Sequence, residues 1–248
     1  MDKIYRAGID VGSTTAKIAV FDDTDNLIYS RYERHNAKVT ELVSMYLQEL
    51  ADKFGDIRMS LCVTGSVGMS TAEQLGADFV QEVVAATVFA RNRYPEAKAL
   101  IDIGGEDAKV VFFNGQSMEL RMNGNCAGGT GAFIDQMSVL MGCSIEQMNK
   151  LALTSTHLYP MAARCGVFAK TDIQPLINEG ATKADLAASI FQAVVNQTIS
   201  GLACGKPIRG HVAFLGGPLH FLPQLKAAFI RTLKLTDETA IDPPNSHL

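Results

Sequence analysis

The sequence predicts an α/β fold whose second half repeats the architecture of the first. Patterns typical of strands alternate with patterns typical of helices along the 248 residues. The segment DVGSTTAKIAVF (10–21) also aligns without gaps with DIGGEDAKVVFF (102–113), so that an Asp, a Gly and an Ala-Lys pair fall at the same offsets. With 47% hydrophobic and 19% charged residues, the chain can bury a large core. We expect two halves, residues 1–90 and residues 91–248.

Strand patterns dominate the start of the first half. Residues 6–23 (RAGIDVGSTTAKIAVFDD) predict a strand, a turn and a second strand, and residues 26–35 (NLIYSRYERH) predict a third strand. A helix is expected over residues 39–54, where six apolar residues form one stripe: Val39, Leu42, Val43, Tyr46, Leu47 and Leu50. A short buried strand at 59–65 and a helix at 81–94 complete this half.

The second half begins with a similar pattern. Residues 97–123 predict another hairpin-like pair of strands, and the Asn114–Gly115 dipeptide favours a hairpin turn. Most of the following residues have the periodicity of helices. A last buried strand is expected within residues 210–219 (GHVAFLGGPL), a segment that ends with the two glycines of GGPL.

The composition excludes several classes of partner. A formal charge of −4 and scattered Lys and Arg residues give no basic surface for nucleic acid. The N-terminus has no apolar signal-peptide core, and no apolar run approaches the roughly 18 residues that a membrane span needs. We therefore expect a cytoplasmic protein without nucleic-acid or membrane partners.

The repeated segments predict a phosphate-binding device. Each copy leaves a hydrophobic strand, turns at glycine so that backbone N–H groups are exposed, and returns as a strand with a Lys at its start. Ser and Thr hydroxyls beside such N–H groups suit phosphate, and an Asp at the strand end suits hydrated Mg²⁺. A single copy is equally compatible with an ordinary glycine-rich hairpin. Two copies together favour a polyphosphate held from both sides.

Five cysteines, an odd and widely spaced set, are typical of thiols rather than of disulfides. Cys126 lies in NGNCAGGTGAF and Cys165 in AARCGVFAKTD, and each precedes an apolar helical pattern. The partial positive charge of a helix N-terminus lowers the pKa of a thiol. Neither cysteine belongs to a Cys-x-x-Cys pair, so one chain lacks the ligands of a closed zinc site or of its own cluster. Their spacing alone is best explained by two buried structural thiols.

Three other cysteines are assigned no chemistry. We expect Cys62 in the core, Cys143 at a helix end, and Cys204 at another helix end. The five histidines form no metal-ligand spacing and are expected on the surface or in loops.

The segments DVGSTTAK, DIGGEDAK and GGP (216–218) resemble the phosphate-1, phosphate-2 and adenosine motifs of the actin, Hsp70 and sugar-kinase superfold. More narrowly, DIGGED, NCAGGTGAF and ARCGVFAKTD resemble the activator ATPases of 2-hydroxyacyl-CoA dehydratases and the related ATPase subunits of benzoyl-CoA reductases. The resemblance to these CoA-substrate-specific enzyme activases covers the chain from Gly8 to about Leu248. It implies a duplicated, ribonuclease H-like α/β fold with the nucleotide in the central cleft.

The resemblance assigns ATP or ADP to the repeated turns. Asp10 and Asp102 would organise Mg²⁺ and its waters. Glu106 stands where the family often has Gln, so it would either act as a base or orient the attacking water. The other nucleotide contacts that the family implies are Gly12, Ser13, Thr14, Thr15, Lys17, Gly104, Gly105, Gly128, Gly129, Thr130, Gly131, Gly216 and Gly217.

The resemblance also implies an iron–sulfur centre. Two cysteines per chain, Cys126 and Cys165, become four in a symmetric homodimer, which fits one shared [4Fe–4S] cluster. Such an activator takes an electron from a low-potential donor such as ferredoxin or flavodoxin. It then uses ATP to pass that electron to a 2-hydroxyacyl-CoA dehydratase, where radical removal of water begins.

Two other functions remain open from the sequence. A small-molecule kinase of the same superfold would phosphorylate a sugar or small acid and would not need paired interface cysteines. A nucleotide-switched binding module without a cluster would be indifferent to Cys126 and Cys165. The chain stops at AIDPPNSHL, where this fold normally continues into a closing helix, so we expect a piece of a longer polypeptide.

Overall fold

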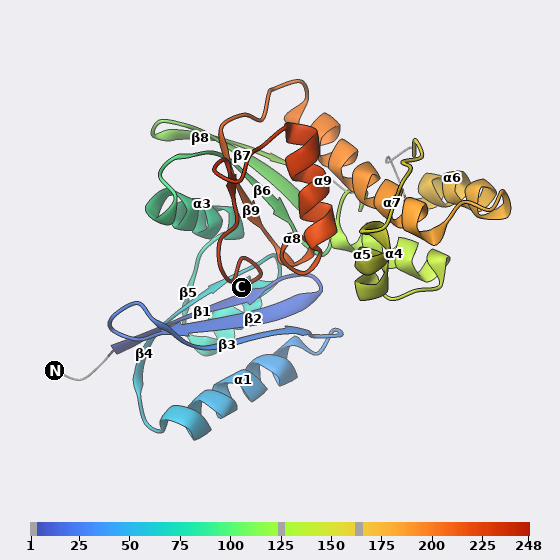
Figure 1. Ribbon diagram of the computed structural model, residues 1–248. Helices are drawn as coiled ribbons and strands as arrows, with labels where there is room; N and C mark the ends of the chain where they lie inside the picture. The colour runs from blue at the N-terminus through green and yellow to red at the C-terminus, as the bar shows by residue number, and fades with distance from the viewer. Residues whose placement is uncertain (1–3, 124–126, 162–165) are drawn as a thin grey trace. The chain divides into compact units, whose positions relative to one another are not determined.

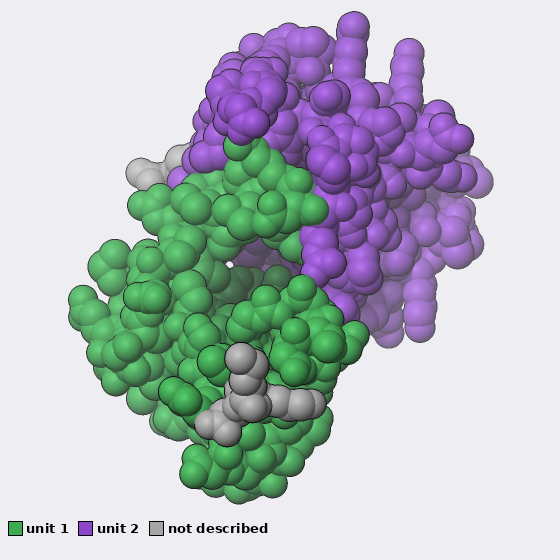
Figure 2. All heavy atoms as spheres, turned by 90° about the vertical axis from the view of Figure 1, so that its left-hand side faces the viewer, with its two compact units in different colours: residues 1–92, 248 green, residues 93–247 purple. Residues whose placement is uncertain are grey.

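The computed structural model describes residues 4–123, 127–161 and 166–248, and it divides the chain into two compact units. The first unit extends to Asn92 and includes Leu248, and the second spans Arg93–His247 (Figure 2). Each unit has its own mixed five-stranded sheet and its own hydrophobic core. The units are therefore described separately.

The sheet of the first unit has the strand order β3-β2-β1-β4-β5. Strands β1 and β2 form an antiparallel hairpin, β3 extends it, and β4 pairs in parallel with β1. Helix α1 lies along this sheet and buries Val43, Tyr46 and Leu50, as the apolar stripe predicts (Figure 1). The elements of this unit are β1 (Ile4–Val11), β2 (Thr15–Phe21), β3 (Leu27–Arg34), α1 (Val39–Phe54), β4 (Arg58–Thr64), α2 (Gly68–Leu75), β5 (Asp78–Phe79) and α3 (Glu82–Arg93), whose last residue begins the second unit.

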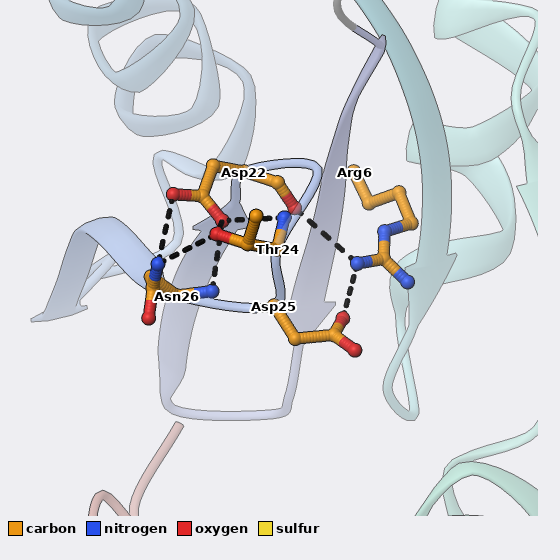
Figure 3. Close-up of polar contacts among 5 residues, drawn as sticks. All are labelled: Arg6, Asp22, Thr24, Asp25 and Asn26. Carbon is orange, nitrogen blue, oxygen red and sulfur yellow. Dashed lines mark hydrogen bonds and ion pairs between the residues drawn. The ribbon is translucent and has the colours of Figure 1, made fainter.

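The acidic turn between β2 and β3 is closed by its own side chains (Figure 3). The Asp22 carboxylate accepts hydrogen bonds from the backbone and hydroxyl of Thr24, at 2.9 and 2.8 Å, and from the backbone and amide of Asn26, at 2.9 and 3.1 Å. Arg6 donates to the Asp22 carbonyl at 3.3 Å and pairs with Asp25. The hydrogen bonds to the Asp22 carboxylate hold its pKa well below the usual range, and the bond from the Asn26 N–H has the largest effect.

The sheet of the second unit has the order β10-β9-β6-β7-β8, which repeats the order of the first sheet. Helices α4, α5 and α6 gather beside one end of the long helix α7 (Figure 1). The elements of this unit are β6 (Ala97–Ile103), β7 (Ala108–Asn114), β8 (Ser117–Met122), α4 (Gly131–Met141), α5 (Ile145–Ala152), α6 (Gly166–Asn178), α7 (Lys183–Thr198), the π-helical turn η1 (Ile199–Ala203), β9 (His211–Leu215), α8 (Gly217–Phe221), α9 (Pro223–Leu233) and β10 (Ala240–Ile241).

The duplication predicted from the sequence extends to the register of the strands. Asp10 lies opposite Lys17 across β1 and β2, and Asp102 lies opposite Lys109 across β6 and β7. In each unit a further parallel strand lies on the other side of the Asp strand. The predicted duplicated α/β fold of the actin and sugar-kinase type is confirmed.

Some elements differ from the sequence prediction. Residues 97–123 form three strands rather than a pair, because the chain reverses at 104–107 as well as at Asn114–Gly115. Cys62 is half-buried rather than in the core, since its neighbour Val63 takes the buried face of β4. His35 lies in the loop after β3, which fits the expectation of surface or loop histidines, but it is buried at 8% exposure.

Helix α7 forms the centre of the second core. Ile190, Phe191, Val194 and Val195 are each at most 1% exposed. The stretch Lys183–Ala203 is long and apolar enough, by length and composition, to cross a membrane, although no uninterrupted apolar run of that length exists. Because 67% of its most apolar window is buried inside the fold, it has the character of a core helix.

Candidate functional site

The first turn joins β1 to β2 through Gly12, Ser13 and Thr14. The Gly12 N–H donates to the Thr15 carbonyl at 3.0 Å, which closes the turn. The hydroxyls of Ser13 and Thr14 lie 3.5 Å apart and both residues are partly exposed. Lys17 Nζ lies 2.5 Å from Asp10 Oδ2, so the two residues that the register brings together form an ion pair. The turn thus presents two hydroxyls next to a paired acid and base.

The Asp10 carboxylate has the character of a cation site. Its Oδ1 is buried and has no hydrogen-bond partner among the described residues, while Oδ2 binds Lys17. A buried carboxylate oxygen normally finds a partner, and hydrated Mg²⁺ favours such hard oxygen ligands. This oxygen therefore fits a Mg²⁺ bound directly or through water.

His35 supports the first turn from the end of β3, a role that the sequence analysis missed. Its Nε2 donates to the Gly12 carbonyl at 3.1 Å, while its Nδ1 accepts from the Ala37 N–H at 3.1 Å. The His35 N–H also donates to the Thr14 carbonyl at 3.2 Å. These bonds require the neutral tautomer with the proton on Nε2. The position of His35 as the last residue of the predicted third strand was the only available signal.

The second turn repeats this backbone with different side chains. The Gly104 N–H donates to the Asp107 carbonyl at 2.8 Å, and Asp102 is 7% exposed at the end of β6. Lys109 Nζ pairs with Asp107 at 2.8 Å, inside the turn. Glu106 is exposed at the tip of the turn. This turn therefore presents a solvent-accessible carboxylate where the first turn presents hydroxyls.

Glycines on the neighbouring parallel strands lie against each acid. Gly216 has φ 96°, and a side chain there would overlap the Ile103 carbonyl and come within 2.7 Å of Asp102 Oδ1. Gly65 has φ 99°, and a side chain there would overlap the Val11 carbonyl and the Asp10 carboxylate. Gly65 is thus the first-unit equivalent of Gly216. The sequence analysis missed it, because the segments around the two glycines share little beyond a strand that ends in Gly.

The Gly216 motif is also tied to the end of the chain. The Gly216 N–H donates to the Ser246 carbonyl at 2.9 Å, so this donor is occupied. Gly217 is buried and begins α8, with Pro218 in the first turn of that helix. These residues can approach a nucleotide through their backbone surface rather than through the Gly216 N–H.

Helix α4 starts on the second turn. The Gly131 N–H donates to the Gly104 carbonyl at 3.0 Å, and the Ala132 N–H donates to the Gly105 carbonyl at 2.7 Å. A side chain at Gly131 would lie 3.2 Å from the Gly104 carbonyl and 3.3 Å from Pro218. The structure therefore brings together, around Gly131, the second turn, the glycine segment before α4 and the GGP motif (216–218). Gly128, Gly129 and Thr130 are buried, and the Thr130 hydroxyl donates to the Ala127 carbonyl at 2.6 Å.

The predicted cluster ligands, Cys126 and Cys165, lie outside the described residues. The chemistry of the donor set is compatible with a shared cluster, since α4 begins five residues after Cys126 and α6 begins one residue after Cys165. Within 4–123, 127–161 and 166–248, no group of three or more His, Cys, Asp or Glu residues could hold a metal ion. The described part of one chain therefore offers no self-contained metal centre.

The other cysteines have structural surroundings. Burial raises the pKa of the Cys143 thiol, which keeps it protonated and unreactive. Cys204 is exposed and ends the π-helical turn η1 in a left-handed conformation, as its predicted place at a helix end requires.

The sequence matches the BadF/BadG/BcrA/BcrD ATPase family over residues 7–241. It is 29% identical over 218 residues to the (R)-2-hydroxyglutaryl-CoA dehydratase activating ATPase of Acidaminococcus fermentans, which covers 86% of this chain and 83% of that protein.

Two solved structures are similar over almost the whole chain. Component A of the A. fermentans (R)-2-hydroxyglutaryl-CoA dehydratase has a TM-score of 0.86 at 25% identity, with 98% of this chain and 93% of that chain covered. The activator of the 2-hydroxyisocaproyl-CoA dehydratase from Clostridium difficile, with bound ADPNP, has a TM-score of 0.84 at 25% identity, with 98% and 90% covered. The fold that carries the hydroxyl-rich first turn and the acidic second turn is thus similar to that of a protein solved with bound ADPNP.

Proposed function

The chain belongs to the BadF/BadG/BcrA/BcrD ATPase family, and from this premise we propose that it is an ATP-hydrolysing iron–sulfur activator of a 2-hydroxyacyl-CoA dehydratase-type enzyme. The observation that carries the proposal is the pair of hydrogen bonds from Gly131 and Ala132 to the second turn. They attach α4, the helix that follows Cys126, directly to a turn of nucleotide-binding type. Nucleotide state and the cysteine segment would thereby be coupled.

In this proposal the first turn binds the phosphates. Ser13, Thr14 and Thr15 would donate hydroxyl hydrogen bonds to phosphate oxygens, with backbone help from Gly12. Lys17 would hold Asp10 in place and contribute positive charge near the phosphates. The unpartnered Asp10 oxygen and Asp102 would organise Mg²⁺ and its waters, and the metal would neutralise charge on the phosphates.

The second turn carries the hydrolytic group. The exposed Glu106 carboxylate would orient the attacking water. Gly104, Gly105 and the Gly128–Gly131 segment would approach the phosphates through their backbone, while Gly216 and Gly217 would pass the adenosine. Loss of the γ-phosphate would change the contacts of this turn and, through Gly131, the position of α4.

Cys126 and Cys165 of two subunits would hold one [4Fe–4S] cluster, which supplies one low-potential electron when bound. The helices that begin after each cysteine would stabilise its negative charge. In this arrangement the protein is a cytoplasmic homodimer. It would receive electrons from ferredoxin or flavodoxin and deliver them to a dehydratase-like partner.

The proposal is tested by iron and acid-labile sulfide analysis on protein purified without oxygen. We expect about two irons per chain, which is four per dimer. The Cys126→Ser and Cys165→Ser variants should lose iron, whereas Cys143→Ser, a matched change at a half-buried thiol, should retain it. A folded, dimeric wild-type preparation that contains no iron would contradict the proposal.

A further inference from the structure

Helix α7 contacts the chain segments near both predicted cluster cysteines. At its first turns it holds residues 155–159, which precede Cys165, and at its last turn it packs against Gly129, which follows Cys126. Ten of its sixteen residues are buried, so the helix is an integral part of the core. A rigid element with a contact at each end is suited to transmit displacement between them.

The N-terminal end of α7 holds residues 155–159 by hydrogen bonds to their backbone. Asp185 Oδ1 accepts from the N–H groups of Thr156 and His157, both at 2.8 Å. Ser189 Oγ accepts from the Tyr159 N–H at 2.8 Å. Asp185 is 5% exposed and Ser189 is 1% exposed, which shields these bonds from water. The Thr182 hydroxyl and the two backbone donors hold the pKa of Asp185 well below its usual range, so its carboxylate remains ionised.

The C-terminal end of α7 supports the glycine segment before α4. A side chain at Gly129 would lie 3.2 Å from Gln197 Cγ and 3.5 Å from the Thr198 hydroxyl. That hydroxyl is buried without a hydrogen-bond partner among the described residues. A cavity of about 210 Å³, lined in part by Gly128, Gln197 and Thr198, leaves room for this backbone to shift against the helix.

Helix α4 connects the same two ends by a second route. Its first N–H groups bind the carbonyls of the second turn, and the carbonyl of its last residue, Met141, accepts a hydrogen bond from Lys183 Nζ of α7 at 2.9 Å. Helices α4 and α7 are therefore connected near both of their ends. The second turn lies at one end of this pair. At the other end lie the hydrogen bonds of Asp185 and Ser189 to residues 155–159, which we call the clamp.

We propose that α7 couples the second turn to residues 155–159, with Asp185 and Ser189 as the positioning residues of the segment that leads to Cys165. The coupling rests on the proposed function, because it requires that nucleotide acts on the second turn. The clamp itself does not depend on that function. The two cysteine segments would then respond to nucleotide as one body rather than separately.

The test is amide hydrogen exchange of residues 155–159, with nucleotide binding measured in parallel by calorimetry. In the wild-type chain we expect a non-hydrolysable ATP analogue to change this exchange at least about fivefold relative to ADP. Ser189→Ala and Asp185→Asn should each speed up the exchange about tenfold and remove its dependence on nucleotide. Both should still bind the analogue, since neither residue lies in the turns.

The matched control is Ser144→Ala, which removes the hydrogen bond from the Gln147 N–H to the capping hydroxyl of α5 but no bond to residues 155–159. It should keep the wild-type response. The coupling is overturned if Ser189→Ala also keeps that response, or if the wild-type chain binds the analogue without any change at 155–159. A chain that binds no nucleotide overturns the proposed function and the coupling with it, and the calorimetry identifies that case. If Asp185→Asn does not fold, Ser189→Ala decides alone.

Discussion

The two nucleotide-type turns share a backbone but differ in what they bind. Both follow a strand whose second-last residue is Asp, both close by a hydrogen bond from Gly12 or Gly104, and both lie beside a glycine with positive φ that follows the parallel strand. The first turn presents hydroxyls, and His35 binds its carbonyls. The second presents Glu106, and its carbonyls bind α4. The duplication therefore preserved the backbone of the turn, while the outgoing hydrogen bonds connect the first copy to His35 and the second copy to α4.

Each copy also pairs its lysine with a carboxylate. Lys17 pairs with Asp10 on the neighbouring strand, and Lys109 pairs with Asp107 of the second turn. Residue 107 is an Asp, whereas its equivalent in the first turn, Thr15, carries no charge.

The largest expected effect breaks what the two copies share. Gly65→Ala and Gly216→Ala each place a methyl group on a backbone carbonyl at a positive φ, so each should lower the free energy of unfolding by at least about 3 kcal/mol. Gly12→Ala is the control, because its methyl group would have only an ordinary contact, at 3.5 Å from the Thr15 carbonyl. Urea unfolding followed by circular dichroism measures all three. Losses below about 1 kcal/mol for both left-handed glycines would refute the shared geometry.

A second prediction separates the turns by their kinetics. Glu106→Ala should lower kcat for ATP hydrolysis about 100-fold with little change in nucleotide affinity, because only the water loses its partner. Glu106→Gln should stay within about tenfold of the wild type, since an amide can also orient water. If Glu106→Gln is as slow as Glu106→Ala, the carboxylate acts as a base rather than as an orienting group. Normal turnover by Glu106→Ala would remove this residue from the mechanism.

Substitutions in the first turn should show the opposite pattern, with an effect on ATP affinity rather than on kcat. Removing one hydroxyl, in Ser13→Ala or Thr14→Ala, should raise the Kd for ATP about tenfold, because a hydrogen bond to a charged phosphate is lost. The kcat at saturating ATP should change little. Calorimetry gives the Kd and a phosphate-release assay gives the kcat. A fall in kcat without a change in Kd would show that the two turns do not divide their tasks in this way.

His35→Ala should have a smaller effect, confined to the first turn. It leaves the Gly12 carbonyl and the Ala37 N–H without their partner, which should cost about 1 to 2 kcal/mol in unfolding free energy. The free energy of ATP binding should become less favourable by a similar amount. His35→Gln keeps one donor and one acceptor and should recover part of the loss. Equal stability of the alanine variant and the wild type would remove His35 from the turn.

The smallest expected effect is a pH dependence in the second unit. Burial, with Lys226 as a secondary cause, lowers the pKa of His220, so the folded state resists its protonation. In the unfolded chain His220 gains a proton as the pH falls below the ordinary histidine pKa of about 6.5, whereas in the folded chain it does so only at lower pH. The free energy of unfolding should therefore fall, by under about 1 kcal/mol, between pH 7 and pH 5. His220→Asn should flatten this part of the stability curve. An unchanged slope in that variant would assign the effect to another group.

Local patterns were sufficient to predict the strands of the two hairpins and the duplication. Alternation in residues 6–35 and the apolar stripe of α1 depend only on neighbours in sequence. His35 and Gly65 could not be predicted, because each acquires its role from a strand pairing between distant residues. The three-strand arrangement of residues 97–123 was not predicted, because the reversals at 104–107 and at Asn114–Gly115 were recognised in separate patterns and not combined.

The assembly of the motifs around Gly131 is also non-local. The sequence placed Gly104, Gly131 and Pro218 in separate motifs, and only the fold packs Gly104 and Pro218 so closely around Gly131 that a side chain there would lie 3.2 and 3.3 Å from them. The clamp at Asp185 was invisible in sequence for the same reason, since its partners lie 28 and 29 residues away. Residue types identified the chemistry, and tertiary contacts determined which motifs act together.

In the proposed activator, one nucleotide would control the environment of a cluster that two chains would share. The most direct measurement is the rate at which a chelator removes iron from the anaerobic protein saturated with ADP or with a non-hydrolysable ATP analogue. We predict rates that differ by roughly fivefold or more, the change expected for about 1 kcal/mol of coupling. Equal rates in protein that binds iron and both nucleotides would contradict the claim.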